Sequence, residues 1–69
     1  MSFKVGDIIF QKRDKITFTI VEKKGNKLVL EYYDTHTMSI RNITMNKNQL
    51  FLQFKDRPED LEHFKVILK

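Results

Sequence analysis

The stretch Ile16-Thr-Phe-Thr-Ile-Val-Glu-Lys-Lys-Gly-Asn-Lys-Leu-Val-Leu-Glu-Tyr-Tyr33 contains two runs rich in alternating β-branched, aliphatic and aromatic residues, separated by Lys24-Gly-Asn26. Successive side chains of a strand point to opposite faces of a sheet, so this pattern with a glycine-containing turn predicts a β-hairpin. Because the hairpin occupies the middle of a 69-residue chain, it determines the fold class.

The register of this hairpin follows from the need to bring its two apolar sets into one core. A two-residue Gly25-Asn26 loop would put these sets on opposite faces, because a shift of one residue exchanges the faces. A three-residue loop, Lys24 to Asn26, pairs Ile20 with Leu30, and Asn26 tolerates the left-handed backbone that such loops need. We therefore predict the three-residue loop.

The same reasoning extends to the next turn. A loop of Asp34-Thr35-His36 pairs Leu30 with Ile40 and predicts a third strand over Met38–Met45. The alternation of apolar and polar residues is interrupted between Ile40 and Ile43, which predicts a β-bulge at Arg41-Asn42. In this register Tyr33 faces outward together with Lys23, Lys27 and Arg41, on a polar, basic face.

The rest of the chain contains shorter signals. Lys4-Val-Gly-Asp7 predicts a turn that leads into a strand at Ile8–Phe10. Gln49–Phe54 alternates like another strand, whereas Asp56-Arg-Pro-Glu59 is typical of a helix start, with Asp as the cap, Pro in the first turn and Glu three residues after the cap. We expect a short helix carrying Leu61 and Phe64, then a closing strand at Val66–Leu68.

Together these elements predict one domain over residues 1–69, mainly β, as a small, partly open antiparallel barrel of about five strands with a short C-terminal helix. The opening Phe3-Lys-Val-Gly-Asp-Ile-Ile9 resembles the start of SH3-like barrels of the KOW and Tudor type and of small bacterial and phage proteins with that barrel. The resemblance implies a binding module. The chain lacks the second glycine of a KOW motif and the tryptophan and aromatic cluster of a methyl-lysine cage.

Composition narrows the function classes. The chain has no cysteine, no long apolar run and no signal peptide, so we expect a cytoplasmic protein without membrane partners. Its spacing of His36 and His63 does not suggest a metal site, and nothing indicates a cofactor, a small-molecule substrate or catalytic residues. We therefore expect a non-enzymatic module.

Two classes of partner remain. The first is a protein, or a second copy of the chain, contacted through Val29 and Phe51, which the alternation places outside the core; by analogy, small chains of this composition include phage and mobile-element proteins that bind host proteins. The alternative is nucleic acid, because the net charge is +4 and the isoelectric point about 9.5. The residues expected to bind nucleic acid are Lys12, Arg13, Lys15, Lys23, Lys27, Tyr33 and Arg41.

Overall fold

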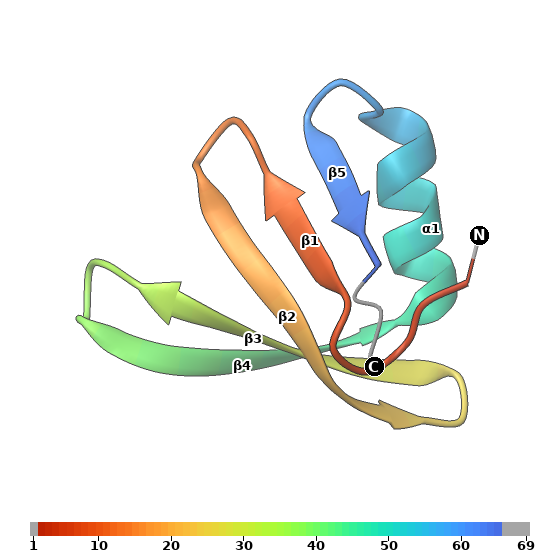
Figure 1. The fold of residues 1–69 in the computed structure, drawn as a ribbon, viewed down its shortest axis with the longest axis horizontal. Coiled ribbons are helices and arrows are strands. Elements are labelled where there is room, and N and C mark those ends of the chain that lie inside the picture. The colour runs from red at the N-terminus through yellow and green to blue at the C-terminus, as the bar shows by residue number, and fades with distance from the viewer. Residues whose placement is uncertain (1, 66–69) are drawn as a thin grey trace.

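A computed structural model describes residues 2–65 of the chain. They form one five-stranded antiparallel sheet with the strand order β4-β3-β2-β1-β5, and one helix (Figure 1). The elements are β1 (Ile8–Gln11), β2 (Ile16–Lys24), β3 (Lys27–Asp34), β4 (Ser39–Asn46), α1 (Lys47–Asp56) and β5 (Leu61–Phe64). The predicted mainly β class with five antiparallel strands and one short helix is confirmed, and the sheet is not closed.

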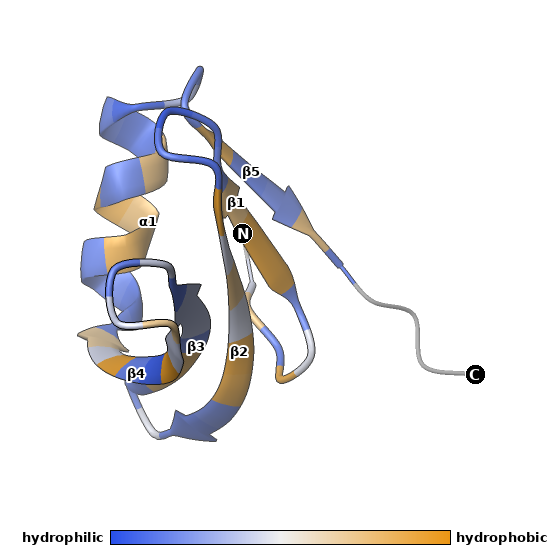
Figure 2. Ribbon diagram, turned by 90° about the vertical axis from the view of Figure 1, so that its left-hand side faces the viewer, coloured by the Kyte–Doolittle hydropathy of each residue, from blue (hydrophilic) through white to orange (hydrophobic). Residues whose placement is uncertain are grey.

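The core lies between α1 and one face of the sheet. Leu50 and Phe54, four residues apart on α1, pack with apolar residues from β1, β2 and β3, and Figure 2 shows the apolar side of the helix turned toward the strands. The opposite face of the sheet, called the outer face below, is covered by no helix within residues 2–65. The buried apolar side chains are Phe3, Ile9, Ile20, Leu28, Leu30, Leu50 and Phe54.

The hairpin of β2 and β3 has the predicted core pair but not the predicted turn. Ile20 is opposite Leu30, as expected, whereas Lys24 is opposite Lys27, so the loop is the two residues Gly25 and Asn26. A bulge at Val21, between the pairs of Ile20 and Glu22, corrects the register. Gly25, with φ 55°, takes the left-handed conformation expected of Asn26.

The predicted register of β3 with β4 is wrong. Leu30 is opposite Ile43 and Asp34 is opposite Ser39, and the ladder is regular from end to end, without the bulge expected at Arg41-Asn42. The turn is longer than predicted because the Asp34 carboxylate accepts the His36 N–H (2.9 Å) and stabilises a wider loop. The shift moves Ile40 to the outer face and Arg41 to the face that carries Tyr32.

The predicted strand at Gln49–Phe54 is also wrong, because these residues belong to α1. Asn46 caps the helix: its side chain accepts the Asn48 N–H (2.8 Å), and the Gln49 side chain reaches back to the Asn46 N–H (3.4 Å). Leu50 and Phe54 fit the spacing of a helix as well as that of a strand. The helix forms here because Asn46 caps its start and because a helix covers the open face of the sheet.

The predicted helix after Asp56 does not form. Asp56 ends α1, and a turn in which the Asp60 N–H donates to the Arg57 carbonyl (3.1 Å) leads into β5. β5 pairs with β1, with His63 opposite Ile9, and thereby satisfies the second edge of β1. The closing strand expected at Val66–Leu68 lies outside the described residues.

A buried polar pair joins the first turn of the chain to β5. His63 Nε2 lies 2.8 Å from Asp7 Oδ2, and the two side chains are 8% and 2% exposed. Asp7 Oδ2 also accepts the Lys4 N–H (3.0 Å), and the His63 ring packs in a tilted arrangement against Phe3, with the ring centres 5.0 Å apart. This pair anchors β5 against the start of β1.

Candidate protein-interaction surface

β4 lies at one edge of the sheet, and no strand of residues 2–65 pairs with its far side. The N–H of Lys47, just after β4, donates to the Asn26 carbonyl (2.9 Å) in register with the ladder. Hydrogen-bonded pairs alternate along an antiparallel ladder, so the odd-numbered residues of β4 bond to β3. The backbone N–H and C=O groups of Ile40, Asn42 and Thr44 therefore point to the free edge.

Three apolar side chains are exposed where β3 and β4 meet their turn: Tyr33 (53%), Met38 (77%) and Ile40 (66%). Tyr33 and Ile40 are directly opposite each other on the outer face. We call these three residues the edge patch. Figure 1 shows the β3–β4 hairpin extending away from α1 and β5, so the edge patch lies far from the core.

Met38 has an unusual backbone for its side chain. Its φ is 54°, in the left-handed region that favours glycine or asparagine, and it is not buried by any neighbour. Strained non-glycine residues occur preferentially at functional positions. The stability of the fold therefore gives no reason for a methionine here.

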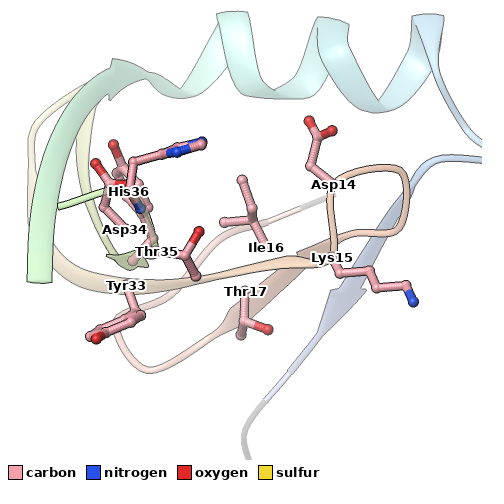
Figure 3. A pocket seen from close by; sticks show the side chains of 9 residues that line it. Asp14, Lys15, Ile16, Thr17, Tyr33, Asp34, Thr35 and His36 are labelled. Carbon is pink, nitrogen blue, oxygen red and sulfur yellow. The ribbon is translucent and has the colours of Figure 1, made fainter. Parts of the chain in front are cut away.

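A groove of about 630 Å³ lies beside the edge patch, between the β1–β2 turn and the β3–β4 turn. Figure 3 shows Asp14, Ile16 and His36 on the helix side of the strands and Thr17 and Tyr33 on the outer side. The groove residues are Asp14, Lys15, Ile16, Thr17, Tyr32, Tyr33, Asp34, Thr35 and His36.

Asp34 is the ionised centre of the β3–β4 turn. The pKa of Asp34 lies below its ordinary 3.8, mainly because its carboxylate accepts a hydrogen bond from the His36 N–H. Hydrogen bonds from Thr37 and the charge of the Arg41 guanidinium lower this pKa further. The Arg41 Nε lies 3.2 Å from Asp34 Oδ2. The Asp34 carboxylate thus stabilises the β3–β4 turn through these contacts.

The residues predicted to bind nucleic acid do not share one face. Lys15 and Tyr33 line the groove, and Tyr33 points outward as predicted. Lys27 lies at the opposite end of the hairpin, on the outer face opposite Lys24. Lys23 was expected beside it on that face, but the bulge turns Lys23 to the helix side, where its Nζ lies 3.4 Å from the Phe3 carbonyl.

The other three basic residues contact neighbouring acids, Lys12 and Arg41 through their side chains and Arg13 through its backbone N–H. Lys12 Nζ lies 2.8 Å from Glu62 Oε1, and the Arg13 N–H donates to Asp60 Oδ1 (2.7 Å). Arg41 was expected on the outer face; it lies on the other face and pairs with Asp34. The ion pairs of Lys12 and Arg41 reduce the positive charge that a polyanion would meet, whereas the Arg13 contact uses the backbone N–H and leaves the guanidinium charge unchanged.

The structure separates Val29 and Phe51, which the sequence grouped as one contact surface. Val29 is half-buried on the outer face, whereas Phe51 is 44% exposed on α1, across the sheet. Phe51 lies beside Phe3, Lys23 and Lys47 in a shallow hollow. These two residues cannot contact one small ligand together.

Sequence reasoning missed Met38 and Ile40, because the shorter loop placed Ile40 in the core. The Asp34-x-His36 pattern was the available signal, since an aspartate that bonds the N–H two residues on favours a wider turn.

No family model, curated protein or solved structure matches this chain. Among residues 2–65 no helix has the length and apolar character needed to cross a membrane, and no cluster of three or more His, Asp or Glu side chains suits a metal ion.

Proposed function

We propose that this protein is a protein-interaction module that adds an extended segment of a partner protein to the free edge of β4. The observation that carries this proposal is the regular eight-residue edge strand whose Ile40, Asn42 and Thr44 backbone groups are unbonded to β3, next to three exposed apolar side chains. Main-chain hydrogen bonds supply affinity in such complexes, and alternate side chains supply specificity.

The edge lacks the features that usually protect a strand from such pairing. Proteins blunt exposed edges with proline, lysine or a bulge. β4 contains no proline and no lysine, its ladder with β3 is regular, and the bulge of this sheet lies in β2. Its one basic residue, Arg41, points away from the outer face and pairs with Asp34.

The charge of the chain favours an acidic partner over a second copy. The net charge is +4, so two copies repel each other, whereas an acidic segment is attracted. The bound segment would place apolar residues at alternate positions, next to Ile40 and Tyr33 on the outer face. This is a different protein whose binding region is extended, acidic overall and apolar on one side.

The test removes one edge donor without touching the β3–β4 ladder. In the Asn42→Pro variant the lost N–H points to the free edge, where proline is tolerated. The matched control, Asn42→Ala, keeps the N–H. We expect random displayed peptides selected on the wild-type protein to bind wild type and Asn42→Ala equally and to bind Asn42→Pro at least about tenfold more weakly.

Three results would contradict the proposal. One is selected peptides that bind Asn42→Pro as well as wild type, with native circular dichroism for both. Another is a self-associated protein in light scattering that Asn42→Pro makes monomeric, which would assign the edge to a second copy. The third is tight, steeply salt-dependent binding of labelled single-stranded RNA or DNA with no peptide selected, which would favour the nucleic-acid alternative.

A further inference from the structure

The shallow hollow beside Phe51 lies at the start of α1, where the N-terminal segment of the chain passes the helix (Figure 1). Its volume is about 150 Å³, and a cavity of roughly that volume accommodates a group the size of benzene. It is separate from the groove beside the edge patch, with which it shares no described lining residue. We call it the basic hollow, and it is lined by Ser2, Phe3, Lys23, Lys47, Asn48 and Phe51.

Among the described lining residues of the basic hollow, every charged side chain is a lysine. Lys23 Nζ donates to the Phe3 carbonyl (3.4 Å), which places this ammonium group at the wall of the hollow and leaves two of its three N–H donors for a ligand. Lys65 adds a third cation, because its Nζ donates to Oγ of the lining residue Ser2 (3.2 Å). Within residues 2–65 no carboxylate pairs with Lys23, Lys47 or Lys65. Three like charges so close to one hollow favour an anion there.

Phe51 adds an aromatic wall to these charges. The buried residues of α1 are Leu50 and Phe54, whereas Phe51 is 44% exposed and lies beside Phe3 at the start of the chain. An exposed ring contributes little to the core, but it packs favourably against a second ring in an offset or edge-to-face arrangement. The basic hollow therefore offers a ring contact next to several cations.

We propose that the basic hollow binds an aryl phosphate, in the form of a phosphotyrosine side chain of another protein. The ring packs against Phe51, and the phosphate, which is close to a dianion at neutral pH, accepts hydrogen bonds from the ammonium groups of Lys23 and Lys47. These two side chains are exposed, so both can turn toward the ligand. A phosphate ion alone leaves Phe51 unused, and an aromatic carboxylate carries one charge less. In a nucleotide the ribose separates the base from the phosphate by more than a benzene-sized hollow spans.

The test is a titration of the isotope-labelled protein with phenyl phosphate, followed by NMR at the backbone N–H groups of Lys47, Asn48 and Phe51. Phenyl sulfate keeps the shape of this probe with a single negative charge, inorganic phosphate lacks the ring, and uridine monophosphate separates ring and phosphate with a ribose. We expect phenyl phosphate to shift the three signals, and each comparison ligand to bind at least about threefold more weakly. A phosphotyrosine flanked by glycines should bind like phenyl phosphate, and the same peptide without the phosphate should bind at least about threefold more weakly.

Paired lysine variants isolate the ionic contribution. Lys23→Gln combined with Lys47→Gln should weaken phenyl phosphate binding at least about fivefold. The matched control, Lys15→Gln combined with Lys55→Gln, removes the same charge from two exposed lysines outside the lining of the hollow. We expect the control to bind phenyl phosphate like the wild type.

Paired apolar variants of α1 isolate the ring contact. Phe51→Ala should weaken phenyl phosphate binding at least about threefold. Its matched control is Leu52→Ala, because Leu52 is the next residue of α1, is 52% exposed and lies outside the lining. We expect this control to leave binding unchanged.

The proposal is overturned if phenyl phosphate shifts none of the three signals, if phenyl sulfate or inorganic phosphate binds as tightly, or if the Lys23 and Lys47 substitutions leave binding unchanged. Tighter binding of uridine monophosphate would also overturn it, because the hollow would then take a nucleotide. These ligand comparisons use the unaltered protein, so a variant that fails to fold leaves the test intact. The basic hollow is independent of the β4 edge: Asn42→Pro should bind phenyl phosphate like the wild type, whether or not the edge binds peptides.

Discussion

The buried pair of Asp7 and His63 offers the sharpest test of how this small fold is held together. His63→Ala removes a 2.8 Å contact between side chains that are 8% and 2% exposed, and leaves the Asp7 carboxylate buried with one fewer donor. Breaking a buried pair of this kind costs about 3–5 kcal/mol. The substitution also removes the ring contacts of His63 with Phe3 and Phe54. We expect the free energy of unfolding to fall by about 4 kcal/mol.

The expected loss is large for a domain of this size. Each kcal/mol lowers the Tm of a small domain by about 4–8 °C, so His63→Ala should lower it by roughly 16–32 °C. Urea denaturation followed by circular dichroism measures the change in free energy, and thermal denaturation measures the change in Tm. The matched control is Glu62→Ala, on the other face of β5, which removes an exposed ion pair with Lys12 and should cost at most about 1 kcal/mol.

A double-mutant cycle identifies the pair itself as the cause. If Asp7 and His63 stabilise each other, Asp7→Asn combined with His63→Ala destabilises less than the sum of the single changes, by about 1–3 kcal/mol. Additive effects, or a loss below about 1 kcal/mol for His63→Ala, would refute the reasoning. A large loss with additive effects would mean that the burial of the ring, and not the hydrogen bond, anchors β5.

Three further predictions concern the turns. Asn46→Ala should lower the free energy of unfolding measured with urea by about 1 kcal/mol, because it removes the cap of α1. The control Asn26→Ala removes one exposed hydrogen bond to Asn46 and should lower it less, and equal losses would contradict the role of the cap. Met38→Asn should raise the free energy of unfolding by about 0.5–1 kcal/mol, because asparagine tolerates a φ of 54°, while it weakens peptide binding; unchanged stability would show that the backbone there is unstrained. The pKa of Asp34 is lower in the folded than in the unfolded chain, so its contribution to stability is present above pH 3.8 and is lost as the pH falls below that value. Asp34→Asn should therefore lose less stability than the wild type between neutral pH and about pH 2. An unchanged dependence of stability on acid pH would contradict this role of Asp34.

The strands with clear alternation were predictable because their signal is local. The pattern of Ile16–Tyr33 specifies two strands and their apolar faces wherever they are placed, and a shared core then requires Ile20 opposite Leu30. The outward direction of Tyr33 followed from the same periodicity and is confirmed. The length of the loop and the bulge were not predictable from the sequence. A shorter loop with a bulge at Val21 gives the same core pair as a longer loop without a bulge.

The candidate sites depended on features that the sequence shows only ambiguously. The edge patch exists because β4 is shifted by an odd number of residues from the predicted register, which turns Ile40 outward. The apolar cavity between α1 and the sheet, which Ile43 and Leu50 help to line, exists because Gln49–Phe54 forms a helix over the sheet and Arg57–Asp60 forms the following turn. Each of these segments was assigned to another element or register by its local pattern.

By itself, then, the sequence determined the β-rich class, the central hairpin and the turn at Gly6-Asp7, because alternation and turn chemistry act between near neighbours. The tertiary structure decided whether the segments of residues 47–56 and 61–64 became helix or strand. Leu50 and Phe54 suit both periods, and only a helix there covers the open face of the sheet. Leu61–Phe64 is strand because it pairs with the otherwise unpaired edge of β1 and brings His63 to the Asp7 carboxylate, which accepts its hydrogen bond. Long-range burial and edge pairing outweighed the local signals.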